Sequence, residues 1–416
     1  MKSYFENWLP PLGKRMWHLL TGYTISLFGS GMTESFLVIY LHQIREMDLA
    51  VSGVIIAVAG VAGVIAVPIA GWIGDRYGND RSLVILLVVS AMGQVGMAFA
   101  QMPGWALAAS FFTGAGAAGS WNALSAILAV SVRTNQRNDT FGVAFALQHL
   151  GFGIGSAVGG WILNGHSSLA FMIIFLLDAA TFLFFAVFAS FRLSGSIPRK
   201  GVKAEGDAFS GTVGYGEVIR DRALLLTIFL YAIFAVVLSG ITTTAFPQWA
   251  TGPAHTSIRV VGFAFLTNSC VIVGGQLFVL HLIRERRRTY AVSVTALLFG
   301  MGCLLIFVSG IIRKEFIAGT GFVLAMVLIG FGETLLFSSF PALVNNLAPD
   351  SLRGRYNSMF NLSWQVGSMA GPLLAGWMLG HHWGGGLFFT FTLMSVLIAV
   401  LAVVLGRIVP AHVNKG

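Results

Sequence analysis

The stretch Gly71-Trp-Ile-Gly-Asp75-Arg76-Tyr-Gly78-Asn-Asp-Arg81 decides the fold of this chain. It carries two carboxylates and two guanidinium groups and lies between two apolar stretches, residues 51–73 and 83–100. Each apolar stretch is long enough to cross a bilayer. Because hydrocarbon offers the backbone no hydrogen-bond partner, both stretches are expected to be helices. The sequence therefore predicts a charged turn at a membrane surface.

The whole chain has the composition of a membrane protein. Hydrophobic residues make up 56% of it and charged residues only 10%, whereas soluble domains are about 25% charged. Windows of about 20 apolar residues predict an all-α integral membrane protein with twelve transmembrane helices. They lie near residues 16–42, 51–73, 83–102, 105–131, 140–164, 168–191, 223–249, 259–282, 290–311, 316–346, 357–380 and 386–408. Pro68, Pro341 and Pro372 are expected to kink or end their helices.

The basic residues predict the topology. With the N-terminus inside, 21 of the 25 lysines and arginines fall in inner segments and 4 in outer ones. Inner loops of membrane proteins carry this excess, so both termini are expected in the cytoplasm, in a prokaryotic inner membrane. Residues 1–15 are expected to be a cytoplasmic tail and not a signal peptide. Contact with anionic lipid accounts for the net charge of +9, and no nucleic-acid partner is expected.

The chain divides into two similar halves. Residues 193–222 form a long polar connection, so we expect an N-terminal six-helix bundle (1–192), a cytoplasmic linker (193–222) and a C-terminal six-helix bundle (223–416). A shift of 216 residues aligns residues 137–163 with residues 353–379 and gives six identities. They pair Arg137, Gly151, Gly155, Gly160, Trp161 and Leu163 with Arg353, Gly367, Gly371, Gly376, Trp377 and Leu379.

These features together resemble the major facilitator superfamily, over essentially the whole chain. Its loop between helices 2 and 3 reads Gly-x-x-x-Asp-Arg-x-Gly followed by basic residues, matched here by Gly71, Asp75, Arg76, Gly78 and Arg81. Asn79 and Asp80 depart from the pattern, because the family has arginine or lysine there. The resemblance implies two pseudo-symmetric six-helix bundles that alternate access to a central site. It also implies that Asp75 and Arg76 hold the outward-facing state; alternatively, Arg76 and Arg81 only anchor the loop inside.

The fifth predicted helix resembles that of drug/proton antiporters. Their motif Gly-x-x-x-Gly-Pro-x-x-Gly-Gly is matched by Gly151, Gly155, Gly159 and Gly160, with Ser156 in place of the proline. The eleventh helix keeps the proline, in Gly367, Gly371 and Pro372. The arginine that this group carries in helix 4 is absent, since Ser110 stands there. Small residues every four positions let a neighbouring backbone approach, so these glycines form either a fixed packing surface or a seam that opens. The run Gly114-Ala-Gly116-Ala-Ala-Gly119 has no preceding strand and is expected to pack helices and not to bind a dinucleotide.

Three acids lie inside predicted spans: Glu34, Asp178 and Glu333. Ionisable groups are costly in a membrane and are functional candidates. The resemblance implies that helices 1 and 10 line the central cavity, so Glu34 and Glu333 are predicted to bind protons and substrate. The alternative for both is an interhelical hydrogen bond. Asp178, on an outer helix, is expected to be structural, and His149 either joins a proton relay or is simply packed.

These residues predict a proton-coupled exporter of lipophilic cationic or neutral small molecules, of the multidrug-efflux type. No lysine or arginine sits at mid-span, which disfavours anionic substrates. The proton gradient is the expected energy source, with no cofactor and no metal, and a monomer in the bilayer is expected. The alternative is a dedicated transporter of one metabolite, lipid or sugar with the same fold. A receptor or an enzyme is a third class, but no nucleophile–base pair or metal-ligand spacing favours it.

Overall fold

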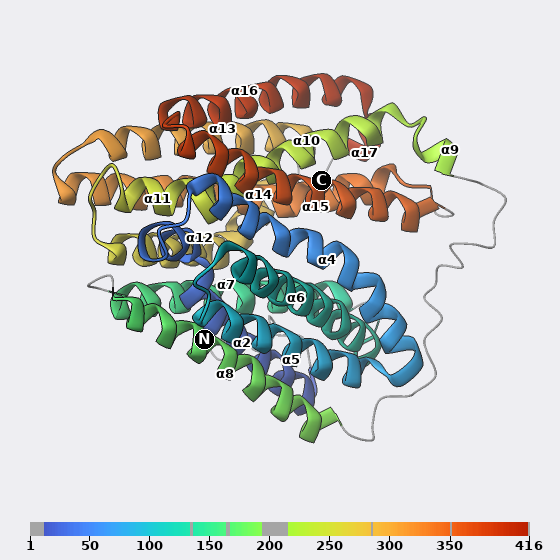
Figure 1. Cartoon of the computed structure of the whole chain (residues 1–416). Coiled ribbons are helices and arrows are strands. Elements are labelled where there is room, and N and C mark those ends of the chain that lie inside the picture. The colour runs from blue at the N-terminus through green and yellow to red at the C-terminus, as the bar shows by residue number, and fades with distance from the viewer. Residues whose placement is uncertain are drawn as a thin grey trace, which may run out of the picture. The chain divides into compact units, whose positions relative to one another are not determined.

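The computed structural model describes residues 12–133, 136–163, 167–193, 215–283, 286–349 and 352–414 (Figure 1). Their backbone forms twelve long helical segments, which confirms the predicted all-α membrane fold. Ten of these segments are long and apolar enough to cross a membrane. The other two, α6 and α15, are as long but carry many small and polar residues. Most of the predicted tail (1–15) and linker (193–222) lies outside the described residues.

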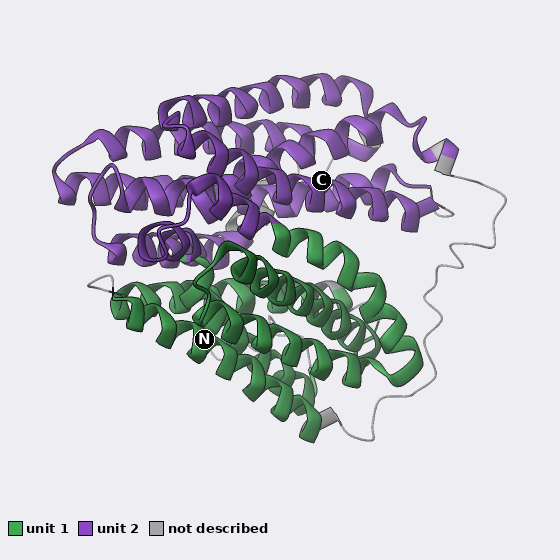
Figure 2. Cartoon of the chain, in the orientation of Figure 1, with its two compact units in different colours: residues 1–36, 58–202 green, residues 37–57, 203–416 purple. Residues whose placement is uncertain are grey.

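The chain forms two compact units, coloured separately in Figure 2. Unit 1 contains residues 1–36 and 58–202, and unit 2 contains residues 37–57 and 203–416. Residues 37–57, which end the first span and begin the second, thus group with the C-terminal half of the chain. The division into bundles 1–192 and 223–416 stays a prediction.

Unit 1 is built from five helices and most of a sixth. They are α2 (Lys14–Glu34), α4 (Leu49–Tyr77) from residue 58 onward, α5 (Asn79–Ala98), α6 (Pro103–Ser131), α7 (Arg137–Ile162) and α8 (Ser168–Leu193). Leucine, isoleucine and phenylalanine side chains from α2, α5, α6 and α8 fill its core, among them Leu20, Leu87, Ile127 and Phe185. This core positions the helices that carry Glu34 and Asp178.

Unit 2 contains the remaining helices. The short ones are α3 (Leu37–Ile39), α9 (Tyr215–Val218), α11 (Phe246–Thr251), α17 (Ala411–Asn414) and two π-helical segments, η1 (Tyr40–Ile44) and η3 (Gly240–Ala245). The long ones are α10 (Arg222–Ser239), α12 (Ile258–Ile283), α13 (Arg288–Ile311), α14 (Glu315–Leu347), α15 (Arg353–Gly380) and α16 (Gly384–Ile408).

The two units repeat the same helix pairing. In unit 1, α2 packs on α7 and on α8, while α5 packs on α6 and on α8. In unit 2, α10 packs on α15 and on α16, while α13 packs on α14 and on α16. Counted along the spans, each pair in unit 1 has its counterpart six helices later. The weak internal similarity of the sequence therefore corresponds to a repeated packing arrangement.

Glycines set the closest of these contacts in both units. A Cβ at Gly155 of α7 would collide with the backbone carbonyl of Phe28 in α2. A Cβ at Gly371 of α15 would collide with the carbonyl of Val236 in α10. Gly151 and Gly367 make equivalent contacts with the carbonyls of the residues four positions earlier, Thr24 and Ala232. These four glycines, the seam glycines, thus allow two helix backbones to pack closely. Such packing matters in a bilayer, because the hydrophobic effect does not drive helices together in lipid.

Gly155→Val is expected to destabilise unit 1 by about 1–3 kcal/mol, because the clash is with backbone that cannot rotate away. Thermal unfolding of the purified chain in detergent should show the lower midpoint. Gly142→Ala is the matched control, since it lies on the same helix with nothing within 4 Å of its added Cβ. Equal midpoints for the two variants would contradict the assignment of this seam as a packing contact.

The charged turn of residues 71–81 is tighter than the sequence suggested. Helix α4 continues to Tyr77 and α5 begins at Asn79, so Gly78 alone breaks the helical backbone. Its φ of 99° lies in the region that only glycine adopts without strain. The Ser82 hydroxyl donates to the carbonyl of Ala70 at 3.0 Å and ties the two helices together behind the turn.

None of the three predicted prolines ends its helix, because Pro68, Pro341 and Pro372 all lie inside α4, α14 and α15. Within the described residues, the first span is broken instead by the turn at Ser35–Phe36 and by the π-helical segment η1, and the first span of the second half by the π-helical segment η3. Segment η3 ends two residues before Pro247, whose missing N–H and bulky ring disturb the hydrogen-bond register of the preceding turn. Segment η1 has no proline, so the sequence offered no local signal for it.

Residues 37–57 are held in unit 2 by polar and glycine contacts. The Gln43 amide donates to the Gln248 side chain at 3.2 Å and to the Thr251 hydroxyl at 2.8 Å. In α4, Gly53 lies so close to α15 that an added Cβ would sit 3.1 Å from the Cα of Gly376. The end of the first span and the start of the second are therefore packed on α11 and α15.

Candidate functional site

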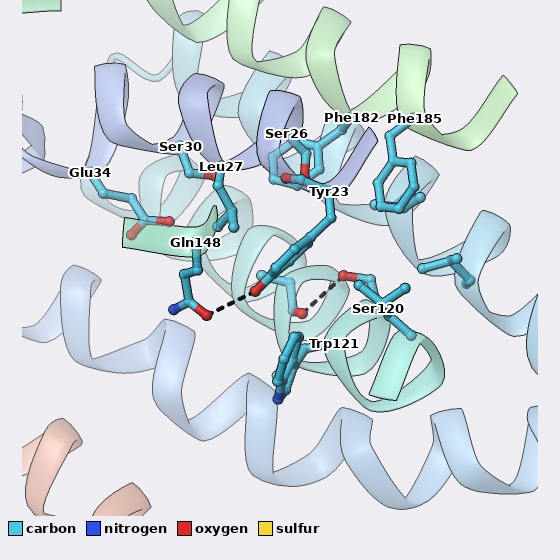
Figure 3. A pocket seen from close by; sticks show the side chains of 15 residues that line it. Tyr23, Ser26, Leu27, Ser30, Glu34, Ser120, Trp121, Gln148, Phe182 and Phe185 are labelled. Carbon is cyan, nitrogen blue, oxygen red and sulfur yellow. Dashed lines mark hydrogen bonds between the residues drawn. The ribbon is translucent and has the colours of Figure 1, made fainter. Parts of the chain in front are cut away.

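A cavity of about 250 Å³ lies inside unit 1, among α2, α5, α6, α7 and α8 (Figure 3). Its wall combines hydroxyl and amide groups with aromatic rings and one carboxylate. The polar and aromatic lining residues are Tyr23, Ser26, Ser30, Glu34, Ser120, Trp121, Gln148, Phe182 and Phe185. Among the residues that line it there is no lysine and no arginine. The cavity can therefore accommodate an apolar body and balance a positive charge.

Tyr23 organises one wall of the cavity. Its hydroxyl donates to Gln148 Oε1 at 2.9 Å, the dashed bond in Figure 3. Its ring stacks on Trp121, with the centroids 5.4 Å apart and the planes 26° from parallel. Tyr23 and Gln148 could not be singled out from the sequence, because aromatic and amide side chains occur on several spans and nothing local marks the ones that meet.

Glu34 is the last residue of α2 and lines this cavity. Its side chain is exposed, and within the described residues its carboxylate makes no hydrogen bond. Ser30, one turn earlier on α2, lines the same cavity. Gly31 lies against the backbone of Phe152 in α7 instead. The carboxylate of Glu34 is thus available to a ligand.

The two neighbours of Glu34 fix its direction. The Thr33 hydroxyl bonds Oδ2 of Asp178 in α8 at 2.8 Å, and the Ser35 hydroxyl lies 2.7 Å from that of Ser156 in α7. Successive residues of a helix point to different sides. With Thr33 anchored on α8 and Ser35 on α7, Glu34 is left to face the cavity between them.

Ser156 stands where the antiporter motif has a proline, and it supplies a contact that proline could not make. Its hydroxyl donates to the carbonyl of Phe152 at 2.8 Å and accepts from Ser35. The departure from the motif is therefore an extra hydrogen-bonded link between α7 and the residue after Glu34.

Asp178 is fully buried behind this cavity, in α8. Besides Thr33, the Thr181 hydroxyl lies 3.4 Å from its Oδ1. An added Cβ at Gly29 would collide with this carboxyl group, so the glycine leaves the space that the carboxyl occupies. Asp178 also interacts electrostatically with Glu34. It joins α2 to α8, as its expected structural role requires, and lies next to the exposed acid.

Glu333 lies in α14 of unit 2 and is 7% exposed. Asn268 of α12 donates from Nδ2 to its Oε1 at 2.9 Å and to the carbonyl of Met326 at 3.3 Å. One oxygen of this carboxyl group therefore takes part in an interhelical hydrogen bond. No local pattern in the sequence marks Asn268 as the partner of Glu333, and the structure identifies it.

The other predicted residues named here do not line the cavity of unit 1. His149 is half-buried and lies against the ring of Phe145, with centroids 4.5 Å apart. Gly159 packs on Met32, Gly160 is buried at the end of α7, and Pro372 is buried in α15. Gly114 packs on the backbone of Ala59, which confirms that its glycine run packs helices.

The residues of the charged turn are mostly exposed. Asp75, Arg76 and Arg81 are exposed, and an added Cβ at Gly71 would meet nothing within 4 Å. The guanidinium of Arg76 lies 5.8 Å from the ring centroid of Trp72 and 5.6 Å from that of Tyr77. Contacts of this kind hold the arginine along its own helix.

Comparison with known proteins places these features in context. The family model described as Major Facilitator Superfamily matches residues 19–313 and 237–415. The chain is 20% identical over 395 residues to a Na(+), Li(+), K(+)/H(+) antiporter of Planococcus maritimus, covering 88% of this chain and 90% of that protein. It is 28% identical over 204 residues to multidrug resistance protein MdtG of Salmonella typhimurium, covering 44% and 50%. The crystal structure of a mutant of the nucleoside transporter NupG aligns with a TM-score of 0.77 at 13% identity, covering 94% of this chain and all of that one.

Proposed function

The chain belongs to the major facilitator superfamily, and on that premise we propose that it exports lipophilic cationic or neutral compounds in exchange for protons. Export by alternating access across a prokaryotic cytoplasmic membrane, by a monomer with both termini inside, completes the proposal. The similarity to MdtG over 44% of the chain and to a cation/proton antiporter over 88% of it supports this choice.

The cavity of unit 1 is the observation that carries the proposal. It offers one exposed carboxylate, Glu34, in the same cavity as the stacked rings of Tyr23 and Trp121. A carboxylate balances an organic cation, and aromatic faces attract the same charge and the apolar body around it. An anionic substrate would meet Glu34 with no basic residue in the cavity wall to offset it.

The two acids are proposed to play different parts. Glu34 is exposed to the cavity, so a proton and a cationic substrate compete for its carboxylate. Glu333 is buried and hydrogen-bonded to Asn268, so it is proposed to carry a proton without touching the substrate. His149 is proposed to take part in proton transfer, and Asp178 is proposed to hold α2 against α8 through Thr33.

The gate residues are proposed to control which side of the membrane the site faces. Gly71, Asp75, Arg76, Gly78 and Arg81 form the turn that the resemblance assigns to this role. Gly78 permits the one-residue turn, since only glycine fits its φ without strain. The glycine seams of α7 and α15, including Gly155 and Gly371, are proposed to slide along α2 and α10 as the site opens.

Purified full-length protein in liposomes with an imposed pH gradient tests this function. A pH-sensitive dye in the lumen should report proton movement when tetraphenylphosphonium or ethidium is added, and protein-free liposomes should give none. A neutral lipophilic substrate should also be moved. Proton movement with Na⁺ or K⁺ but with none of the organic compounds would replace the proposal by inorganic-cation antiport. A response to a single metabolite would replace it by a dedicated transporter.

A further inference from the structure

A second hollow lies in unit 2, at one end of the two helices, α12 and α14, that also carry Asn268 and Glu333. It is a groove of about 680 Å³ between the N-terminal ends of α12 and α14. Its lining residues are Arg259, Val260, Phe263, Glu315, Phe316, Gly319, Thr320, Val323 and Leu324. The apolar ones are accessible from outside, since Phe316 is 86%, Phe263 56% and Leu324 52% exposed.

The groove has the length of one lipid chain segment. On α14 it runs from Phe316 past Thr320 to Leu324, which is two helical turns or about 12 Å. One leaflet of hydrocarbon is about 15 Å thick. The glycine at position 319 keeps the middle of the groove open, because every other side chain there would project toward Val260.

Charges of both signs stand together at one end of the groove. Arg259 is exposed, and its guanidinium makes no hydrogen bond or ion pair within the described part of the chain. Glu315 uses Oε1 to accept from the backbone N–H of Ser257 at 3.0 Å, which leaves Oε2 for another partner. A guanidinium and a carboxylate that line the same groove match a headgroup that carries a phosphate and an ammonium.

We propose that this groove binds one phosphatidylethanolamine molecule. Its phosphate lies on Arg259, its ammonium on Glu315, and one acyl chain along Phe263, Phe316 and Leu324. An acyl chain gains little by leaving other lipid for an apolar groove, because both surroundings are equally apolar. Selectivity therefore comes from the headgroup. Phosphatidylglycerol brings no cation to Glu315, and the choline headgroup brings no N–H donor.

Native mass spectrometry of the full-length protein, titrated with lipids of identical acyl chains, tests this site. Phosphatidylethanolamine should bind about three- to fivefold more tightly than phosphatidylglycerol or phosphatidylcholine, as expected for ion pairs near the membrane surface. Arg259→Gln should weaken the binding of all three lipids, because each of them carries the phosphate that Arg259 holds. Glu315→Gln should lower affinity for phosphatidylethanolamine but not for phosphatidylglycerol, and its amide oxygen can still accept from Ser257.

Arg313→Gln is the matched control, because Arg313 is exposed just before α14 but does not line the groove. Its lipid affinities should equal those of the unmodified protein. A photoreactive acyl chain should crosslink to α12 and α14. Equal affinity for all three lipids, equal losses in the Arg259 and Arg313 variants, or crosslinks confined to other helices would each overturn the proposal. None of these outcomes bears on proton-coupled export, since the readout is binding.

Discussion

Glu34→Gln is expected to weaken the apparent affinity for lipophilic cations by roughly 10- to 100-fold, the cost of losing a charged hydrogen-bonding partner. Glutamine has the same shape, and the Glu34 carboxylate makes no hydrogen bond within the described residues, so the fold should not change. Export of a neutral substrate should lose far less affinity, because it does not use the charge. Substrate titrations of transport in proteoliposomes give both values.

Asp139→Asn is the control for this experiment, since Asp139 is an exposed acid at the start of α7 and does not line the cavity. It should transport cations with unchanged affinity. If Glu34→Gln behaves like Asp139→Asn, the cavity acid does not bind the substrate. If cationic and neutral substrates lose the same amount, Glu34 acts on the protein and not on the charge of its ligand.

Glu333→Gln is expected to abolish the proton release that accompanies binding of a neutral substrate, and to leave only the proton that a cationic substrate displaces from Glu34. The glutamine carbonyl can still accept the hydrogen bond from Asn268, so α12 and α14 should stay connected. What is lost is the group that can gain and release a proton. Stopped-flow measurement of protons released per substrate bound, in detergent, reports this directly.

Asn268→Ala distinguishes the proton-carrying role of Glu333 from its role as a hydrogen-bond acceptor. It removes the contact between α12 and α14 but keeps the acid, so thermal stability should fall while proton release remains. The reverse pattern is expected of Glu333→Gln, with stability close to that of the unmodified chain. Proton release of normal size from Glu333→Gln would show that this carboxyl group only ties two helices together.

Much of the fold could be predicted from the sequence alone. Each of the twelve predicted spans corresponds to a long helical segment, because the length of an apolar run is a local property. The turn at residues 71–81 was placed correctly but made too long, since charge does not reveal where a helix ends. The prolines were poor guides to helix breaks: Pro68, Pro341 and Pro372 lie within continuous helices.

The candidate site was only partly predictable. The free-energy cost of placing an ionisable side chain in a membrane singled out Glu34, Asp178 and Glu333 in the sequence, because such residues are rare in spans unless they have a function or a partner. The same energetic argument applies to all three acids, so it does not predict which of them is exposed and which is buried. Tyr23, Gln148 and Asn268 carry no such signal, because a neutral polar residue on a span is common and its partner is on another helix.

The sequence by itself determined that this protein is a helical membrane protein of two related halves, and which acids it carries within them. Those properties follow from hydrophobic length and spacing, which neighbouring residues set. Only the tertiary structure decided the environment of each acid. Thr33 is anchored to Asp178 on α8 and Ser35 to Ser156 on α7, so Glu34 faces the cavity, while Asn268 holds Glu333 inside unit 2. The direction of a side chain depends on helices distant in the sequence, and no local pattern records it.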